Sequence, residues 1–341
     1  MASALVFTLA VACAVLATIG ARAFAQRYSA VARPGPIVPQ HTRPVPMLGG
    51  LGVAGGVAAS MIVLGGRGVS SPLLAGSLAF LALGLLDDLR PLTPARKLLA
   101  QVAAASAPIA FGLTLPLSGS ESLNSALSLL WVLVVVNAVN VTDVCDGLAV
   151  GLALLAFLGV ALFAEPALVP LCLGAAGACL GVLVFNAPPA SIFLGETGTA
   201  LLGFLLAGVM IESVRPSSWL DLTSATLVVG VFLFELVFLV AVRARRGIAW
   251  WLGSADHFSL RLQSAGLSRW QTDGVAWCVG LALALAAYAV QRVPPSGVLA
   301  IVATVVGFFT VAWRLLLRWE PLASQQVPGA LSHTVGESKR R

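Results

Sequence analysis

Long apolar segments follow one another along almost the whole chain, and this pattern constrains the fold more than any other feature. A helix needs about 20 apolar residues to cross the hydrocarbon core of a membrane. Hydrophobic residues make up 59% of the 341 residues and charged residues only 10%, a balance that water-soluble domains do not reach. The sequence therefore predicts an all-α integral membrane protein, a polytopic bundle of about ten or eleven transmembrane helices. The apolar segments are 2–21, 48–66, 72–86, 98–115, 124–139, 147–163, 167–185, 199–212, 222–242, 274–291 and 297–316.

Two of these segments, 72–86 and 199–212, are shorter than the roughly 17 residues that an upright crossing needs. We expect them to be half-buried or broken helices. Near the N-terminus, residues 23–25 resemble the cleavage site of a secretory signal. Because no Lys or Arg precedes Arg22 and the apolar run is longer than in ordinary signals, a first transmembrane helix is favoured. The five cysteines show no CxxC spacing, so we expect them to be reduced.

Basic residues are divided unequally between the two sets of loops that alternating crossings would produce. Seventeen of the 20 Lys and Arg residues lie in one set, and Arg67, Arg215 and Arg292 lie in the other. Since cytoplasmic loops carry the excess of positive charge, the sequence predicts an outside N-terminus and a cytoplasmic C-terminus. The net charge of +6 then reflects topology, and a nucleic-acid-binding role has no support.

Acidic residues occur at the ends of apolar segments that two crossings separate from one another. An even number of crossings returns the chain to the same face, so these side chains are predicted to meet on the cytoplasmic side. An ionisable group beside the hydrocarbon is costly and usually has a function or a partner. We therefore predict a cytoplasmic active-site cleft. The residues concerned are Asp87, Asp88, Asp143, Asp146, Glu196 and His257.

Carboxylates gathered at one membrane face repel one another unless a cation neutralises them. Hard oxygen ligands suit Mg²⁺, with Mn²⁺ as an alternative. Mg²⁺ commonly keeps coordination positions for substrate phosphate, and two basic clusters are available to bind phosphate at the interface. Phosphoryl transfer is therefore the predicted chemistry. The clusters are Arg90, Arg96 and Lys97, and Arg243, Arg245 and Arg246.

The acidic motifs also have a purely structural interpretation. The pair Asp87 and Asp88 can be a solvated helix end. Asp143 or Asp146 can cap the helix that begins near Gly147, since Asp is a good capping residue. A single motif therefore does not decide between structure and chemistry.

Two further features are open to the same two interpretations. The glycine-rich stretch 49–56 can serve close helix packing instead of phosphate binding. Glu235 lies inside an apolar segment, where it can form an ion pair that orients the following loop or can contact substrate directly.

Taken together, the polar blocks resemble those of the polyprenyl-phosphate N-acetylhexosamine-1-phosphate transferases, commonly named glycosyltransferase family 4. Five blocks follow the family's order over residues 43–266, and the Asp-Asp pair combined with Asn-x-x-Asp-x-x-Asp-Gly-Leu-Ala is highly specific. The family's fold is a helical bundle with a cytoplasmic active-site cleft, which agrees with the topology above. The blocks are Arg43 to Gly50, Gly84 to Asp88 with Lys97, Asn137 to Ala149, Phe193 to Gly198, and His257 ahead of Gly266.

The resemblance implies transfer of a sugar 1-phosphate from a UDP-N-acetylhexosamine to undecaprenyl phosphate, which releases UMP and requires Mg²⁺. It favours UDP-N-acetylglucosamine as the donor. This reaction would be the first membrane step of a cell-envelope polysaccharide pathway at the inner membrane of a bacterium. A homodimer is a further expectation.

The same resemblance implies roles for individual residues. Asp87 and Asp88 would bind or orient the lipid phosphate, with either one a candidate base, and His257 would contact the diphosphate. Glu196, together with Asp88, is the expected metal ligand. The expected substrate-binding residues are Lys97, Asn137, Asn140, Asp143, Asp146 and Arg243.

The chain departs from the family pattern at several positions. Glu196 stands where the family usually has Asp, and Glu235 also replaces an Asp. Ser259 and Leu260 stand where further histidines are expected, and Val144 replaces a Gly. Mg²⁺ demands near-ideal geometry, so the extra methylene of Glu196 supports a rival hypothesis. The rival is a family member of weakened or absent activity that binds polyprenyl phosphate or nucleotide sugar.

The chain shows no sign of more than one folded domain. We expect a single transmembrane transferase domain over residues 1–319 and a polar, disordered cytoplasmic tail over residues 320–341. No repeat of about 20 to 50 residues and no inverted halves are evident, which weakens a transporter hypothesis.

Overall fold

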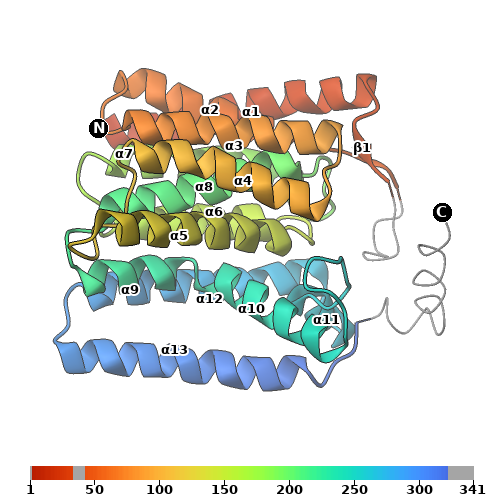
Figure 1. The fold of residues 1–341 in the computed structure, drawn as a ribbon. Helices are drawn as coiled ribbons and strands as arrows, with labels where there is room; N and C mark the ends of the chain where they lie inside the picture. The colour runs from red at the N-terminus through yellow and green to blue at the C-terminus, as the bar shows by residue number, and fades with distance from the viewer. Residues whose placement is uncertain (1, 34–42, 322–341) are drawn as a thin grey trace.

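The computed structural model describes residues 2–33 and 43–321, which form a helical bundle (Figure 1). A short antiparallel pair, β1 (Val31–Ala32) and β2 (Val45–Pro46), lies at one end of the bundle. Residues 322–341 of the expected tail lie outside the described residues. The helices are α1 (Ala2–Arg27), α2 (Gly50–Leu64), α3 (Ser71–Leu89), α4 (Pro94–Ala110), α5 (Glu121–Thr142), α6 (Leu148–Ala161), α7 (Val169–Asn186), α8 (Gly195–Ser213), α9 (Trp219–Val228), α10 (Gly230–Arg245), α11 (Phe258–Ser264), α12 (Arg269–Val290) and α13 (Pro295–Leu316).

Many of these helices are built to cross a membrane. Within the described residues, seven are long and apolar enough, and the bent pair α9 and α10 brings the number to eight if it is one span. Helices α2 and α6 are apolar but shorter. The chain is thus an all-α, multi-pass membrane protein, and its crossings by this measure are fewer than the ten or eleven predicted. The seven are α1, α3, α5, α7, α8, α12 and α13.

The expectation that segments 72–86 and 199–212 are half-buried or broken is wrong. They form α3 and α8, which contain 19 residues each. Both helices continue beyond their apolar stretches into polar residues of the candidate site, which an apolar count leaves out. The break lies instead between α9 and α10, whose axes differ by 70°.

Small residues bring α1, α2 and α7 into close contact. A Cβ atom added at Gly56 of α2 would lie 2.6 Å from the Ala178 Cβ and 2.8 Å from the Ala10 carbonyl oxygen. A Cβ added at Gly177 of α7 would lie 2.6 Å from the Phe7 carbonyl oxygen. The glycine-rich stretch therefore serves helix packing, as its structural interpretation predicts.

Glycines also allow α2 and α3 to approach the first turn of α8. A Cβ at Gly50 would lie 2.2 Å from the Gly198 backbone nitrogen, and one at Gly84 would lie 2.3 Å from the Glu196 carbonyl oxygen. Neither position has room for a side chain. The end of α3 and the beginning of α8 can meet only because of this, and the candidate site lies where they meet.

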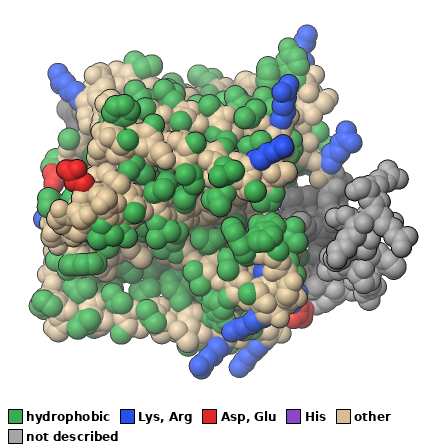
Figure 2. All heavy atoms as spheres, in the orientation of Figure 1, with side chains coloured by type: hydrophobic (Ala, Val, Ile, Leu, Met, Phe, Trp, Pro, Cys, Tyr) green, Lys and Arg blue, Asp and Glu red, His purple; other side chains and the backbone are tan. Residues whose placement is uncertain are grey.

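The two ends of the bundle differ in charge. The Arg215 Nη2 donates to Gln291 Oε1 at 3.2 Å, and Ser70 donates to Glu212, so these loops share one end. Most Lys and Arg side chains in view gather at the opposite end, near β1 and α11 (Figure 2). This separation agrees with the assignment of Arg67, Arg215 and Arg292 to one face.

Candidate active site

Asp88, at the end of α3, fixes the beginning of α8. Its Oδ1 accepts a hydrogen bond from the Glu196 N–H at 2.9 Å, and its Oδ2 accepts from the Thr197 N–H at 2.9 Å and from Thr197 Oγ1 at 2.6 Å. The first N–H groups of a helix lack intrahelical partners and carry partial positive charge, so a carboxylate there is stabilised. Asp88 therefore anchors the turn that presents the Glu196 side chain.

Glu196 is the centre of a polar cluster. Its Oε2 lies 2.5 Å from Lys97 Nζ at the beginning of α4 and accepts from Asn140 Nδ2 of α5 at 2.6 Å. The Lys97 ammonium also lies 3.2 Å from Asp87 Oδ2. The Asp87 Oδ1 accepts from the Leu92 N–H at 2.7 Å, which ties the loop between α3 and α4 to the cluster. Four helices thus contribute to one charged group.

Two hollows adjoin this cluster and share Asn140, Glu196 and Thr199 as lining residues. The smaller has a volume of about 10 Å³ and surrounds the contact between Lys97 and Asp87. The larger is a cavity of about 340 Å³, large enough for a phosphorylated group. Its other lining residues are Met47, Asp88, Asp143, Val144, Cys145, Asp146, Asn186, Phe193 and Gly195.

Asp143 is the carboxylate of the cavity with the least compensation. No described residue donates a hydrogen bond to its side chain or forms an ion pair with it. Burial, and then the charges of Glu196, Asp88 and Asp146, raise the pKa of Asp143 to about 8. The cavity therefore has an excess of negative charge, which favours a proton or a cation there.

Asp146 is held by partners outside the predicted set. Its Oδ2 accepts from the Ala190 N–H at 3.1 Å and lies 3.1 Å from Arg269 Nη1 of α12. Behind it, Asp273 is fully buried, and neither of its oxygens accepts a hydrogen bond from a described residue. Arg269 was counted only as a basic loop residue in the sequence, and nothing in the sequence singled out Asp273.

The capping interpretation of Asp143 and Asp146 is wrong. Helix α6 begins after Gly147, whose φ of 78° lies in the left-handed region, and no side chain caps this end. The Gly147 N–H donates instead to Asn186 Oδ1 at 3.1 Å. Neither aspartate caps α6, both line the larger cavity, and Asn186 is a supporting residue that the sequence analysis missed.

His257 lines neither hollow, and it pairs with Glu235 of α10. The His257 Nδ1 lies 2.6 Å from Glu235 Oε1, and the Phe258 N–H donates to Glu235 Oε2 at 3.2 Å. Both side chains are buried. Glu235 therefore has a partner within the protein, as its structural interpretation expects, and this carboxylate orients the beginning of α11.

Helix α11 also contacts Cys145, which lines the larger cavity. The Cys145 Sγ lies 3.3 Å from Ser259 Oγ and 3.2 Å from Gln263 Nε2. Burial raises the pKa of the Cys145 thiol to about 12, so it is uncharged at neutral pH. None of the five cysteines, all of which lie within the described residues, forms a disulfide.

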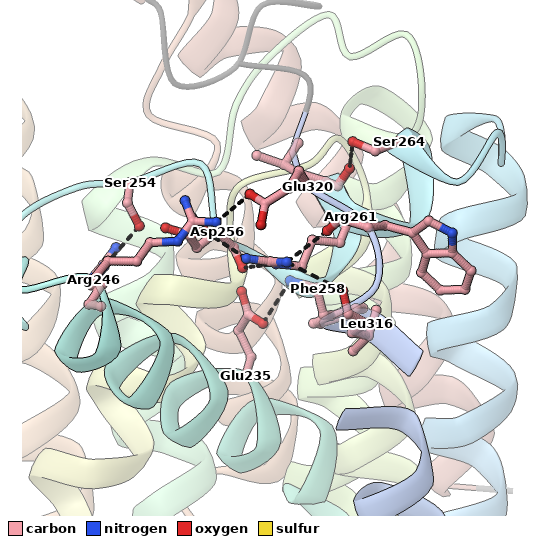
Figure 3. A network of polar contacts seen from close by, with 12 residues as sticks. Glu235, Arg246, Ser254, Asp256, Phe258, Arg261, Ser264, Leu316 and Glu320 are labelled. Carbon is pink, nitrogen blue, oxygen red and sulfur yellow. Dashed lines mark hydrogen bonds and ion pairs between the residues drawn. The ribbon is translucent and has the colours of Figure 1, made fainter. Parts of the chain in front are cut away.

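A second ionic network holds the loop between α10 and α11 in place (Figure 3). The Asp256 Oδ1 lies 2.7 Å from Arg261 Nη2 and 3.1 Å from Arg246 Nη1, and Arg246 also pairs with Glu320. The Arg261 Nη1 donates to the carbonyl oxygens of Leu316 and Trp319 at 3.3 and 2.7 Å. Arg261 thereby fastens the end of α13 to α11.

Asn137 and Arg243, two of the predicted substrate-binding residues, line neither hollow. Asn137 Nδ2 donates to Gln101 Oε1 at 2.9 Å. Arg243 is buried, and its guanidinium donates to Ser254 Oγ at 3.1 Å and to the Trp250 carbonyl oxygen at 2.8 Å. Asn137 therefore connects α5 to α4, and Arg243 holds the loop after α10.

The carboxylates of the larger cavity are candidates to hold a divalent cation. Among the described residues, no group of three or more His, Cys, Asp and Glu side chains forms a complete metal cage. Mg²⁺ commonly takes one or two protein carboxylates and keeps its other positions for water and phosphate. Asp143 and Glu196 are the carboxylates suited to this, because three hydrogen-bond donors already engage Asp88.

The fold and the site define a polytopic membrane protein with a carboxylate-rich cavity at one end of its helical bundle, and comparison with known proteins gives the family. Residues 71–214 match the model of glycosyl transferase family 4. These residues include Asp87, Asp88, Asn140, Asp143, Asp146 and Glu196.

Similar proteins agree over most of the chain. It is 30% identical over 300 residues to decaprenyl-phosphate N-acetylglucosaminephosphotransferase of Mycobacterium tuberculosis, covering 74% of this chain and 73% of the relative. It is 28% identical over 265 residues to a probable undecaprenyl-phosphate N-acetylglucosaminyl 1-phosphate transferase of Bacillus subtilis, covering 72% and 74%. A phospho-N-acetylmuramoyl-pentapeptide-transferase of Prochlorococcus marinus is 36% identical over 233 residues, covering 59% and 61%. The chain belongs to glycosyl transferase family 4, the polyprenyl-phosphate hexosamine-1-phosphate transferases.

Proposed function

We propose that this protein transfers N-acetylglucosamine 1-phosphate from UDP-N-acetylglucosamine to undecaprenyl phosphate. The products are undecaprenyl-pyrophosphate-linked N-acetylglucosamine and UMP, and the reaction begins a cell-envelope polysaccharide. Two of the relatives quoted above carry N-acetylglucosamine in their names, which supports this donor. The phospho-N-acetylmuramoyl-pentapeptide relative makes UDP-N-acetylmuramoyl-pentapeptide the donor to test against it.

The observation that carries the proposal is the cavity lined by Asp88, Asp143, Asp146 and Glu196, with Lys97 beside Glu196 in the adjoining small hollow. The site therefore places several carboxylate groups next to one ammonium group. Anionic phosphates enter it only together with a cation, and the ammonium supplies a further positive charge. A site of this composition suits the joining of two phosphate-bearing molecules.

The bond changes are those of a phosphoryl transfer. An oxygen of the lipid phosphate attacks the phosphorus next to the sugar, a new P–O bond forms, and the P–O bond to the UMP phosphate breaks. UMP leaves with the electron pair of that bond. Any proton on the attacking lipid phosphate passes to a carboxylate of the cluster, and Asp87 and Asp88 remain the two candidates. Catalysis in such transfers consists mainly of positioning and charge stabilisation.

Mg²⁺ is the proposed cofactor, with Mn²⁺ as a substitute, and Glu196 and Asp143 would hold it. When bound, it would neutralise phosphate charge during transfer. The chain's own residues do the remaining work: Asp88 holds the first turn of α8, Asn140 holds Glu196, and Lys97 supplies a positive charge. Glu235 fixes His257, which we propose contacts the diphosphate from α11.

The proposed location follows from the distribution of charge. We propose that the site faces the cytoplasm of a bacterium at its inner membrane, with the N-terminus outside, because most Lys and Arg residues belong to that end. UDP-sugars are made in the cytoplasm, so the donor is available on that side. A homodimer in the membrane is a further proposal.

The test uses full-length protein in detergent with undecaprenyl phosphate and Mg²⁺. UDP-N-acetylglucosamine, UDP-N-acetylgalactosamine and UDP-N-acetylmuramoyl-pentapeptide are supplied separately, and released UMP is measured. We expect UMP with UDP-N-acetylglucosamine and at least about tenfold less with the other two donors. UMP release only with another donor overturns the proposed substrate.

The same assay separates the enzyme from its rival, a binding protein without turnover. No UMP with any donor, combined with tight binding of undecaprenyl phosphate, favours the rival. Glu196→Asp then decides the matter, because it restores the family's usual residue. If only the Glu196→Asp variant releases UMP, the natural chain is a binding protein. If the natural chain releases UMP and the variant does not, Glu196 is the residue that this enzyme uses to bind the metal.

A further inference from the structure

Lys97 occupies the place of a cation within the carboxylate cluster. Its ammonium lies 2.5 Å from Glu196 Oε2 and 3.2 Å from Asp87 Oδ2. The Lys97 side chain is 20% exposed and Asp87 only 7%, so this contact is largely shielded from solvent. Two carboxylates that would otherwise repel each other share one positive charge.

Glu196 stands between the two hollows and can serve either. It lines the small hollow, where Lys97 and Asp87 lie, and the larger cavity, where Asp88 and Asp143 lie. A glutamate side chain has one more rotatable bond than an aspartate. Rotation about side-chain bonds can therefore turn the carboxylate from Lys97 toward Asp143 while the backbone stays fixed by Asp88.

A divalent cation and the Lys97 ammonium compete for the same oxygens. A cation held by Glu196 and Asp143 lies beside Lys97, and two positive charges so close together repel each other. The cation has the larger charge and gains Asp143 as a second ligand, so Glu196 leaves the ammonium, and Lys97 keeps only its longer contact with Asp87. Its ammonium is then free to bind a phosphate oxygen.

We propose that Lys97 is an exchangeable counter-ion, which neutralises Glu196 and Asp87 before a divalent cation binds and is released toward the lipid phosphate afterwards. This rests on the proposed function for the identity of the phosphate. It makes cation binding and polyprenyl-phosphate binding cooperative, since each step prepares the site for the next. This exchange would explain why position 196 is a glutamate, because its side chain is long enough to serve both hollows.

The composition of the chain makes the exchange measurable, since Lys97 and Lys339 are its two lysines. Full-length protein in detergent is treated briefly with the N-hydroxysuccinimide ester of acetic acid, and acetylation of each lysine is measured by mass spectrometry. Lys339 serves as the internal control. We expect Mg²⁺ to raise the ratio of Lys97 to Lys339 acetylation by about fivefold, the scale of one partly shielded ion pair, relative to NaCl of equal ionic strength. An unchanged or lower ratio overturns the exchange.

Two variants sharpen this measurement. Glu196→Gln removes one of the two ion pairs, so Lys97 should react rapidly with or without Mg²⁺. Glu196→Asp shortens the side chain, so the difference between the two conditions should shrink. If Lys97 in Glu196→Gln reacts as slowly as in the unaltered protein, the ion pair does not shield it and the proposal fails.

Cation affinity gives an independent readout that needs no turnover. Free Mn²⁺ is measured by electron paramagnetic resonance during titration of the protein. Lys97→Met removes the competitor and should bind Mn²⁺ roughly tenfold more tightly, whereas Lys97→Arg retains the charge and should not. Equal or weaker binding by Lys97→Met overturns the proposal, as does the absence of any Mn²⁺ binding by the unaltered protein.

Failure of the exchange and failure of the proposed function are distinguishable. UMP release with unchanged Lys97 acetylation keeps the enzyme and rejects the exchange. A cation-dependent acetylation ratio in a protein that releases no UMP keeps the exchange and rejects the transferase.

Discussion

Two acidic networks lie at the same end of the bundle, and they differ in how their charge is compensated. Around Asp256, one carboxylate lies between the guanidinium groups of Arg261 and Arg246, and Glu320 pairs with the latter. Around Asp143, carboxylates outnumber cations and surround a cavity of about 340 Å³. The first network is complete within the protein, and we expect a bound cation or substrate to complete the second.

The difference indicates which acidic residues hold the fold and which serve chemistry. A buried ion pair whose hydrogen bonds are all made fastens one element to another, and removing one partner leaves an unpaired charge. A carboxylate with a raised pKa and an open cavity beside it is available for a ligand. We therefore expect substitutions in the two networks to separate stability from activity.

The largest effect is expected for Arg261→Met. Arg261 is 1% exposed and contacts Asp256 and two carbonyl oxygens at the end of α13. Its loss should lower the free energy of unfolding by about 3 to 5 kcal/mol, because Asp256 loses its closest cation. Thermal unfolding in detergent measures this. The exposed Arg318→Met is the control, with an expected change below about 0.5 kcal/mol, and equal stability of the two variants would contradict the role given to Arg261.

For Asp143→Asn we expect a loss of activity without a loss of stability, in contrast to Arg261→Met. Activity, measured as UMP release, should fall by about a hundredfold because the cavity loses a carboxylate that would hold the cation. Stability without cations should stay equal or rise, since a carboxylate repelled by its neighbours is removed. Glu121→Gln, at the exposed beginning of α5, is the control for activity. A marked loss of stability in Asp143→Asn would place this residue in the fold instead of the site.

Glu235→Gln tests whether the pair with His257 acts on catalysis. The amide can still accept a hydrogen bond from Nδ1 but no longer carries the charge. We expect kcat to fall about tenfold with KM unchanged, because orientation is lost and ground-state binding is kept. Glu235→Asp, which restores the family's usual residue, should retain most activity. An unchanged kcat in Glu235→Gln would confine this pair to a structural role.

A further effect is a pH dependence of the cation-free protein. The pKa of Asp143 is about 8 in the folded chain, above its ordinary value of 3.8, so folding favours the protonated form. This contribution to stability is present in full below the ordinary pKa and is lost as the pH rises through the folded value. The melting temperature in EDTA should therefore fall between about pH 4 and about pH 8, and fall less in Asp143→Asn. A parallel fall in both proteins would assign the effect to other groups.

The sequence predicted the main features of the site because motif and topology agreed. Asp87, Asp88, Asn140, Asp143 and Glu196 do meet at one end of the bundle, since each lies at or near a helix end and the intervening helices return the chain there. Apolar length alone was a poor guide to helix bounds. Helices α3 and α8 extend into acidic residues whose charges are compensated by the Lys97 ammonium and by backbone N–H groups.

Other parts of the site could not be predicted from the sequence. Asn186 and Arg269 are remote in the chain and belong to no motif, and they reach Gly147 and Asp146 only through packing of α7 and α12. Lys97 was predicted to bind substrate, but its contact with Glu196 depends on which rotamer fills a small hollow. Such side-chain partnerships follow from the three-dimensional arrangement and leave no periodic signal.

The central claim is that the open network transfers the phosphate next to the sugar to a lipid phosphate. The direct test uses UDP-N-acetylglucosamine with ³²P in that phosphate, undecaprenyl phosphate and Mg²⁺, followed by separation of lipid from water-soluble products. We predict that the label moves into the lipid fraction as unlabelled UMP is released, and that Asp143→Asn slows this movement about a hundredfold while the folded protein persists. Label that remains wholly in the aqueous fraction, with protein shown to be folded and lipid phosphate present, would contradict the account.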